Sequence, residues 1–289
     1  MDGVLLELDN IRKRYGIRNT RKALDGFSVS LQKGMCLALI GRNGAGKSTA
    51  LKIMANVLIP TEGRVVVHGR VSYVPENMGV YPNLNVEENV RFFSDISEAR
   101  SDYEHILSRL NILGSSKVLA SHLSKGMRRK LSVAVAMAQN PDVVIFDEPF
   151  DGVDQTSSEE IVAMIRDMKR QNRAVVLSSH NISYIDGIAD EVIVIDNGRI
   201  LRRVKLPLEG VKVARFAAAY EEVDAILKSL GLKYDMSGFP YVRISTGSAQ
   251  EDLNSVLVHS GLRVLEFRDL TIAEIYGDVL NDVGVTVQS

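Results

Sequence analysis

The feature that most constrains this chain is a glycine-rich octapeptide, GRNGAGKS, at residues 41–48. An apolar run, Cys36–Ile40, precedes it directly, and a segment with helical spacing, Ser48–Val57, follows it. The spacing G-x-x-x-x-G-K-[ST] between a strand and a helix predicts a P-loop, in which backbone N–H groups and the positive end of the helix surround phosphate oxygens. The alternative is a glycine-rich turn with a chance lysine, and the flanking strand and helix argue against it.

Two residues of this loop have side chains suited to nucleotide chemistry. Lys47 is expected to reach the outer phosphates of ATP and to assist catalysis there, and the Ser48 hydroxyl is expected to ligate a bridging Mg²⁺. The predicted nucleotide-binding residues of the loop and the following helix are Gly41, Asn43, Gly44, Ala45, Gly46, Lys47, Ser48 and Thr49.

A pair of carboxylates follows another apolar run, Val143–Phe146. In P-loop enzymes such a strand ends in the aspartate that holds the metal, which here is Asp147. Glu148 is then placed to polarise an attacking water as general base. Taken alone, a buried strand that ends in two solvated acids is an equally good interpretation, but the P-loop upstream favours the catalytic one.

The composition limits the compartment and the partners. With 45% hydrophobic residues a substantial core is possible, and a formal net charge of -1 gives no general attraction to nucleic acid, so no such partner is expected. The only cysteine, Cys36, lies in an apolar run, which suits a reducing cytosol. The sequence MDGVLLELDN does not resemble a signal peptide, and the longest apolar runs have six residues, so no membrane span is expected.

Short apolar runs alternate with helical patterns, which predicts a mostly parallel α/β core with an antiparallel meander near the amino terminus. Strands are predicted at Val4–Leu8, Phe27–Leu31, Cys36–Ile40, Val65–Val67, Val71–Val74, Val143–Phe146, Val175–Ser178 and Val192–Ile195. Helices are predicted at Ser48–Val57, Val86–Ser94, Tyr103–Leu113, Gly126–Ala138 and Ser157–Gln171. The helices at about residues 84–140 are expected to form an inserted helical subdomain within an ATPase domain of residues 1–205.

A second alternation of strands and helices begins near Leu206 and predicts a small α+β accessory domain at residues 206–289, of the split βαβ kind. Its predicted elements are strand Val211–Phe216, helix Glu221–Leu230, strand Tyr241–Ile244, helix Gln250–Ser260, strand Val264–Phe267 and helix Ile272–Val279. No catalytic motif falls in this region.

The order of the motifs resembles that of the ATP-binding cassette (ABC) family, because Leu123-Ser124-Lys125-Gly126-Met127 lies shortly before the second strand motif. It is similar to the family's L-S-G-G-Q signature and departs from it at Lys125 and Met127, in a form similar to that of a subgroup of exporter ATPases. The resemblance implies that the Ser124 hydroxyl and the Gly126 amide face the γ-phosphate of ATP bound by an opposite subunit. By itself such a string would be an ordinary helix cap.

Four further positions fit the family's order. His180 resembles the switch histidine that contacts the γ-phosphate, and Asp154 resembles a residue of the loop at the dimer interface. Tyr15 resembles the aromatic residue on which adenine stacks, although it could equally be a rim residue. Glu76 stands where most of the family has a glutamine, and we expect it to bind Mg²⁺ in the presence of ATP; the alternative is a solvent-facing loop acid.

The resemblance implies an ATP-hydrolysing subunit that dimerises around Mg-ATP and drives separate integral membrane permease subunits, with export favoured by the form of the signature. The dimer would contain two copies of this chain or one copy and a related chain. The chain would then lie on the inner, cytoplasmic face of the cell membrane. One alternative is a cassette ATPase that acts on ribosomes or DNA, but this chain has neither two cassettes nor a long coiled coil. Another alternative, a regulator without turnover, is disfavoured by the full set of reactive residues.

Overall fold

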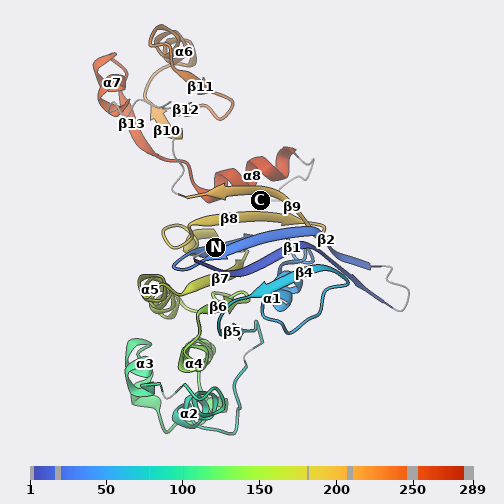
Figure 1. The fold of residues 1–289 in the computed structure, drawn as a ribbon. Helices are drawn as coiled ribbons and strands as arrows, with labels where there is room; N and C mark the ends of the chain where they lie inside the picture. The colour runs from blue at the N-terminus through green and yellow to red at the C-terminus, as the bar shows by residue number, and fades with distance from the viewer. Residues whose placement is uncertain are drawn as a thin grey trace. The chain divides into compact units, whose positions relative to one another are not determined.

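The computed structural model describes residues 3–16, 21–77, 79–99, 101–180, 182–206, 211–245 and 253–282. The chain divides into two compact units, residues 1–204 and residues 205–289 (Figure 1). The first unit contains two sheets and the second contains one, and each unit has its own hydrophobic core.

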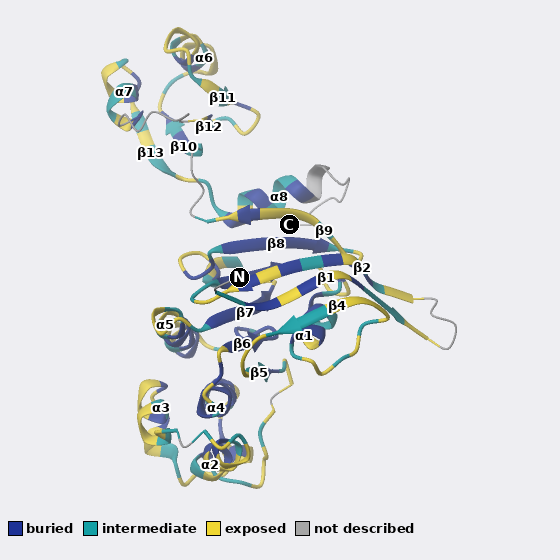
Figure 2. Ribbon diagram, viewed as in Figure 1, coloured by how far each residue is buried: buried dark blue, intermediate teal, exposed yellow. Residues whose placement is uncertain are grey.

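A six-stranded sheet with the order β5-β6-β7-β3-β8-β9 forms the centre of the first unit. Its strands are β3 (Cys36–Ile40), β5 (Val71–Val74), β6 (Val143–Phe146), β7 (Ala174–Ser179), β8 (Glu191–Asp196) and β9 (Arg199–Lys205). The first five strands in this order pair in parallel. Both faces of a parallel sheet are usually covered, which explains why β3, β6 and β7 are buried at every residue. Strands β6 and β7 can be followed in Figure 2.

An antiparallel sheet with the order β2-β1-β4 forms the predicted meander. Its strands are β1 (Val4–Tyr15), β2 (Arg21–Gln32) and β4 (Glu62–Val67). Parts of β1 and β2 alternate between buried and exposed residues, as strands do when one face covers a core.

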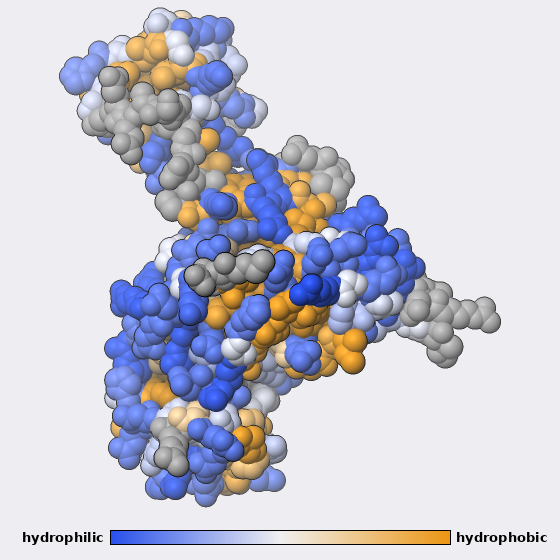
Figure 3. Space-filling model, in the orientation of Figure 1, coloured by the Kyte–Doolittle hydropathy of each residue, from blue (hydrophilic) through white to orange (hydrophobic). Residues whose placement is uncertain are grey.

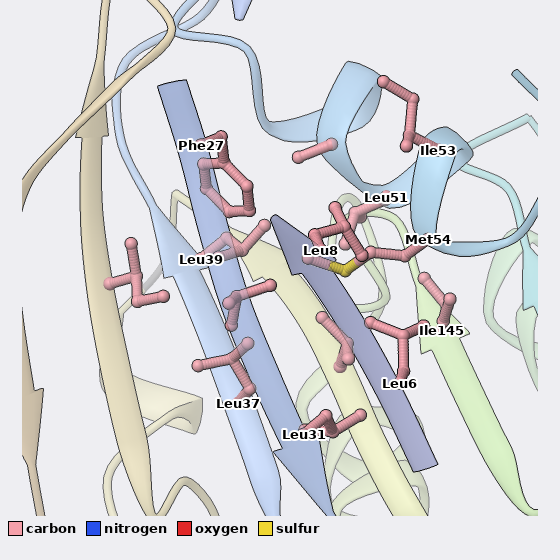
Figure 4. Packing of buried hydrophobic residues seen from close by; sticks show 14 of the residues in the cluster. Leu6, Leu8, Phe27, Leu31, Leu37, Leu39, Leu51, Ile53, Met54 and Ile145 are labelled. Atoms are coloured by element: carbon pink, nitrogen blue, oxygen red, sulfur yellow. The ribbon is translucent and has the colours of Figure 1, made fainter. Parts of the chain in front are cut away.

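The main core lies where this sheet, the central sheet and α1 (Lys47–Met54) meet (Figure 4). Because side chains alternate along a strand, Leu37 and Leu39 of β3 enter this core while Cys36 and Ile40 face the opposite side of the sheet. Its large buried side chains include Leu6, Leu8, Phe27, Leu31, Leu37, Leu39, Leu51, Ile53, Met54 and Ile145.

A helical insert occupies the chain between β5 and β6. It contains α2 (Val86–Ile96), α3 (Tyr103–Arg109), α4 (Lys125–Ala138) and two short 3₁₀ helices, Leu113–Ser115 and Ala120–His122. A capping box begins α2, in which the Asn85 side chain accepts from the Glu88 amide and Glu88 accepts from the Asn85 amide. Since α4 contacts α2, α3, β5 and α5 (Gln155–Arg170), most of its residues are buried (Figure 2). A third 3₁₀ helix, Ile182–Tyr184, follows β7.

The second unit is a four-stranded antiparallel sheet with the order β11-β12-β10-β13. Its elements are β10 (Val211–Phe216), α6 (Tyr220–Ser229), β11 (Lys233–Asp235), β12 (Tyr241–Ser245), α7 (Leu253–His259), β13 (Val264–Asp269) and α8 (Ile272–Asp282). This chain order and strand order give the predicted split βαβ arrangement. Apolar residues of α6 and α7, such as Val223, Leu227 and Leu257, pack with β10 and β12 in its core.

The fold differs from the sequence prediction in the extent of several elements and in two further strands, and the predicted helix Tyr103–Leu113 ends earlier, at Arg109. Strands β1 and β2 extend well beyond the predicted Val4–Leu8 and Phe27–Leu31, because their outer residues pair with each other although most of them are polar or charged. Strands β9 and β11 were not predicted, since β9 has the mostly exposed sequence RILRRVK and β11 has only three residues. The predicted start of helix Gln250–Ser260 lies outside the described residues. Among the described helices, none combines the length and the apolar character that crossing a bilayer requires.

Candidate functional site

The loop between β3 and α1 has a backbone that only glycine adopts easily at one position. Gly46 precedes α1 with a φ of 114°, in the left-handed region. A Cβ atom at this position would lie 2.6 Å from the carbonyl oxygen of Ala23, so the close approach of β2 also requires glycine. Helix α1 therefore begins at Lys47 with no side-chain cap on its first amides, which remain available to an anion.

Lys47 is held by polar groups on both sides of the loop. Its Nζ atom donates to the carbonyl oxygen of Gly41 at 2.8 Å and lies 3.5 Å from Oε1 of Glu148. Its side chain is only 6% exposed, so solvent screens this ion pair weakly. Two of the predicted catalytic residues, far apart in the sequence, are thus in direct contact.

Asp147 is the centre of a buried hydrogen-bond network. Its Oδ1 atom accepts from the Ser48 hydroxyl at 3.1 Å and from the Ser178 hydroxyl at 2.7 Å. Its Oδ2 atom accepts from the Tyr73 hydroxyl at 3.0 Å. Burial, followed by the charge of Asp147, raises the pKa of Tyr73, so the phenol remains a hydrogen-bond donor even at alkaline pH.

Sequence reasoning missed Ser178 and Tyr73, although each lies at the carboxyl end of a predicted strand of the central sheet. That position was the available signal, because the carboxyl ends of parallel strands meet at one edge of a sheet.

Glu148 is bonded to His180 and has a strained backbone. Oε2 of Glu148 lies 2.8 Å from Nδ1 of His180 and accepts the His180 amide at 3.1 Å. The φ of Glu148 is 48°, in the left-handed region, which a residue other than glycine adopts only when its surroundings enforce it. Its amide donates to the Ser178 hydroxyl at 3.0 Å.

Lys47, Ser48, Glu148 and His180 line a cavity of about 840 Å³ beside the P-loop, and Asp147 lies behind Ser48 and does not line it. Tyr15 and Glu76 also line it; Tyr15 is 39% exposed and Glu76 is exposed, so both are accessible to a ligand. The predicted residues that line the cavity are Tyr15, Asn43, Gly44, Gly46, Lys47, Ser48, Thr49, Glu76, Glu148 and His180. Of the other predicted P-loop residues, Gly41 bonds Lys47 and Ala45 is buried below the loop.

Ser124 and Gly126 lie apart from this cavity, at the start of α4. The Ser124 hydroxyl accepts from the Met127 amide at 3.2 Å and so caps the helix. A Cβ atom on Gly126 would lie 2.6 Å from Oδ2 of Asp154 and 2.8 Å from Oγ of Ser157. Asp154 itself caps α5, and the Ser157 amide holds the pKa of this carboxyl below its usual range.

The donor set around Asp147 suits Mg²⁺ held together with a nucleotide. A hydroxyl and a carboxylate are oxygen ligands, and Mg²⁺ on nucleotides commonly has only one or two protein carboxylates because phosphates and water complete its shell. Among the described residues, no group of three or more His, Cys, Asp or Glu side chains is placed to hold a metal without such help. The Ser48 hydroxyl oxygen and Oδ1 of Asp147, which lie 3.1 Å apart, therefore fit this ion.

Comparisons with known proteins agree with this geometry. A family model described as "ABC transporter" matches residues 24–151. The ABC transporter ATP-binding protein NatA of Bacillus subtilis is 30% identical over 200 residues, covering 63% of this chain and 81% of that protein. The Nod factor export ATP-binding protein I of Ralstonia nicotianae is 30% identical over 218 residues, covering 70% of this chain and 67% of that protein.

A solved structure is similar to this chain at the level of the fold. It is the dimeric post-hydrolysis state of an ATP-binding cassette bound to ADP and Pi, with a TM-score of 0.65 and 23% identity over 71% of this chain and 100% of that one. The predicted P-loop fold class is thereby confirmed.

Proposed function

The chain belongs to the family of ABC transporter ATP-binding proteins, and on this premise we propose that it hydrolyses ATP to drive export through separate membrane-spanning chains. The Nod factor export relative supports the direction of transport. A chain that uses ATP to drive export would lie on the inner face of the membrane, where ATP is available. The relatives compared give no support to a role on ribosomes or DNA.

The observation that carries this proposal is the contact of Glu148 with both Lys47 and His180 at the edge of the P-loop cavity. A carboxylate in this position can accept a proton from a water that attacks a bound phosphate. The Nδ1 proton of His180 fixes the orientation of that carboxylate, and Lys47 can exchange its bond to Glu148 for one to a phosphate oxygen. When bound, Mg²⁺ neutralises phosphate charge, and Ser48 and Asp147 are the residues that would hold it.

Turnover needs a second subunit in this proposal. Ser124 and Gly126 do not line the cavity of their own chain, which agrees with a role at the nucleotide of an opposing cassette. The dimeric ATP-binding cassette that is similar in fold supports this arrangement. The partner cassette is a second copy of this chain or a related one.

The test is the rate of Mg-dependent ATP hydrolysis by the purified chain and by its Glu148→Gln variant. Loss of the general base should lower the rate by about 100-fold or more while nucleotide binding is retained. The matched control is Glu159→Gln, which changes an exposed glutamate of α5 that bonds Gln155 and should leave the rate unchanged. An equal rate for Glu148→Gln and the parent would remove Glu148 from the mechanism.

A groove between the central sheet and the helical insert is our candidate for the membrane partner. It has a volume of about 370 Å³, and its wall includes the Tyr81 ring, whose centroid lies 5.8 Å from that of Phe93 and 5.1 Å from that of Phe92. Tyr81 is 47% exposed, and Figure 3 shows apolar surface over the insert near α2. Such a groove suits a short amphipathic helix of a partner. Of the predicted docking segment 78–84, residue 78 lies outside the described residues.

Replacement of Tyr81 by Asp tests this docking surface. A charge in the groove should abolish transport by the complex and leave ATP hydrolysis by the isolated chain unchanged, because Tyr81 does not line the P-loop cavity. Leu113→Asp is the control, since Leu113 is a similarly exposed apolar residue of the insert that does not line the groove. Normal transport by Tyr81→Asp would contradict the assignment.

A further inference from the structure

Arg129 is a buried guanidinium at the junction of three segments. It lies on α4, five residues after the Ser124 cap, and is 3% exposed. Its Nη1 atom donates to the carbonyl oxygen of Pro75 at 2.8 Å, and its Nη2 atom donates to that of Glu76 at 2.8 Å. The same Nη2 atom lies 3.3 Å from the carbonyl oxygen of Glu148.

These contacts place one side chain between the loop of Glu76 and the turn of Glu148. Both glutamates line the P-loop cavity, whereas Arg129 does not. The bonds reach main-chain oxygens, so they fix the backbone from which each carboxylate side chain extends. The planar fork of the guanidinium suits this task, because two nitrogens can bind separate acceptors at fixed angles.

The electrostatic setting of Arg129 agrees with the role that its hydrogen bonds indicate. Burial lowers its pKa, and the charges of Asp151, Glu76, Asp147 and Glu148 oppose that shift. A buried charge is a poor means of adding stability compared with an apolar side chain of similar size. A specific orienting role is a better explanation for a cation in this position.

The backbone of Glu148 is the part of the site that most needs such support. Its left-handed conformation persists only where surrounding bonds enforce it. The Ser178 hydroxyl accepts from its amide, and Arg129 donates to its carbonyl oxygen, so its two backbone polar groups are held from two different elements. Without Arg129, the amide of Asp151, at 3.2 Å, would be the remaining donor to the carbonyl oxygen of Glu148 among the bonds described, and the turn would be held less firmly.

We propose that Arg129 is a positioning residue that ties the Glu76 loop and the Glu148 turn to helix α4. The positions of both carboxylates then depend on this helix, whose first residues would face a partner's nucleotide. This inference rests on the proposed hydrolysis of ATP. It predicts that the P-loop keeps its affinity for nucleotide when Arg129 is changed, while the rate of the chemical step falls.

The experiment compares Arg129→Gln and Arg129→Lys with the parent chain by steady-state ATP hydrolysis and by amide hydrogen exchange. For both variants kcat should fall by about 10- to 100-fold, because a displacement of a catalytic carboxylate by about 1 Å has an effect of this size. KM for ATP should stay near the parent value. The Arg129→Lys variant should recover little of the parent kcat, because one ammonium group cannot bind the separate carbonyl oxygens that the two guanidinium nitrogens bind. Exchange should rise together at residues 76–77 and 148–151.

Arg109→Gln is the control, because Arg109 belongs to the same helical insert but pairs with Asp167. It should leave kcat and the exchange of both loops unchanged. The inference is overturned if Arg129→Gln has the parent kcat, or if exchange rises over the whole of α4 and not specifically in the two loops. If the parent chain itself does not hydrolyse ATP, the proposed function fails, and exchange in the two loops still decides whether Arg129 holds them.

Discussion

At the scale of the residue, the Glu76 carboxylate is subject to two opposing effects, repulsion from neighbouring acids and attraction to a metal ion. Its side chain is exposed at the cavity that also contains Ser48 and Glu148. A carboxylate there adds negative charge near Asp147 and Glu148, but attraction to a divalent ion at ligand distance exceeds repulsion from single charges further away. Glu76 should therefore support the binding of Mg²⁺ when ATP is present.

The Glu76→Gln variant tests this expectation by a magnesium titration of the ATPase rate. The magnesium concentration for half-maximal rate should rise in the variant, because a neutral amide binds the ion more weakly than a carboxylate. Glu62→Gln, which changes an exposed glutamate paired with Arg12, is the control and should leave the titration unchanged. Superimposable curves for Glu76→Gln and the parent would remove Glu76 from the metal site.

At the scale of the element, the start of α4 has two possible roles that one pair of variants separates. Ser124→Ala removes the helix cap and should cost about 1 kcal/mol of unfolding free energy. Ser124→Asn keeps a good cap but replaces the hydroxyl, so it should keep the stability of the parent. If the hydroxyl acts on the nucleotide of a partner, both variants should lose turnover, as measured by ATPase assay beside thermal unfolding. Full turnover by Ser124→Asn would leave Ser124 as a cap only.

The elements also show which parts of the fold were predictable. The P-loop spacing and the apolar strands placed Lys47, Ser48, Asp147 and Glu148 correctly on their elements, because strict local patterns specify them. The partners Tyr73 and Ser178 were missed. Both lie near the carboxyl ends of predicted strands, but Tyr73 is 74 residues from Asp147, and their contact depends on β5 pairing with β6, an order of strands that the sequence does not specify. The hydrogen bonds of Arg129 were missed for a similar reason, because they depend on how α4 packs against distant parts of the chain.

At the scale of the whole molecule, two units with separate cores should respond separately to acid. In the second unit, burial alone would raise the pKa of Glu274, but bonds from Arg268 and Thr271 outweigh it and lower the pKa to about 2. A carboxylate whose pKa is lower in the folded state than in the unfolded state stabilises the fold above its ordinary pKa. That stability is lost as the pH falls towards 2.

Hydrogen exchange of β10 and β12 in the full chain, corrected for intrinsic rates, should therefore show weaker protection as the pH falls from about 4.5 to 2. Glu274→Gln should lower protection at neutral pH and flatten this dependence. The control is Glu222→Gln, an exposed residue of α6, which should behave as the parent. An unchanged pH profile for Glu274→Gln would contradict the assignment of the bonds to Glu274.

The most direct test of an ATP-driven dimer is the molar mass of the Glu148→Gln variant in solution, measured by light scattering with and without Mg-ATP. If the nucleotide is held between two cassettes and released by hydrolysis, a variant without the general base should bind ATP and remain a dimer. The mass should double from one chain of 31.9 kDa when Mg-ATP is added, and should stay at one chain with Mg-ADP. A variant that binds Mg-ATP and remains a single chain would contradict the proposed mechanism.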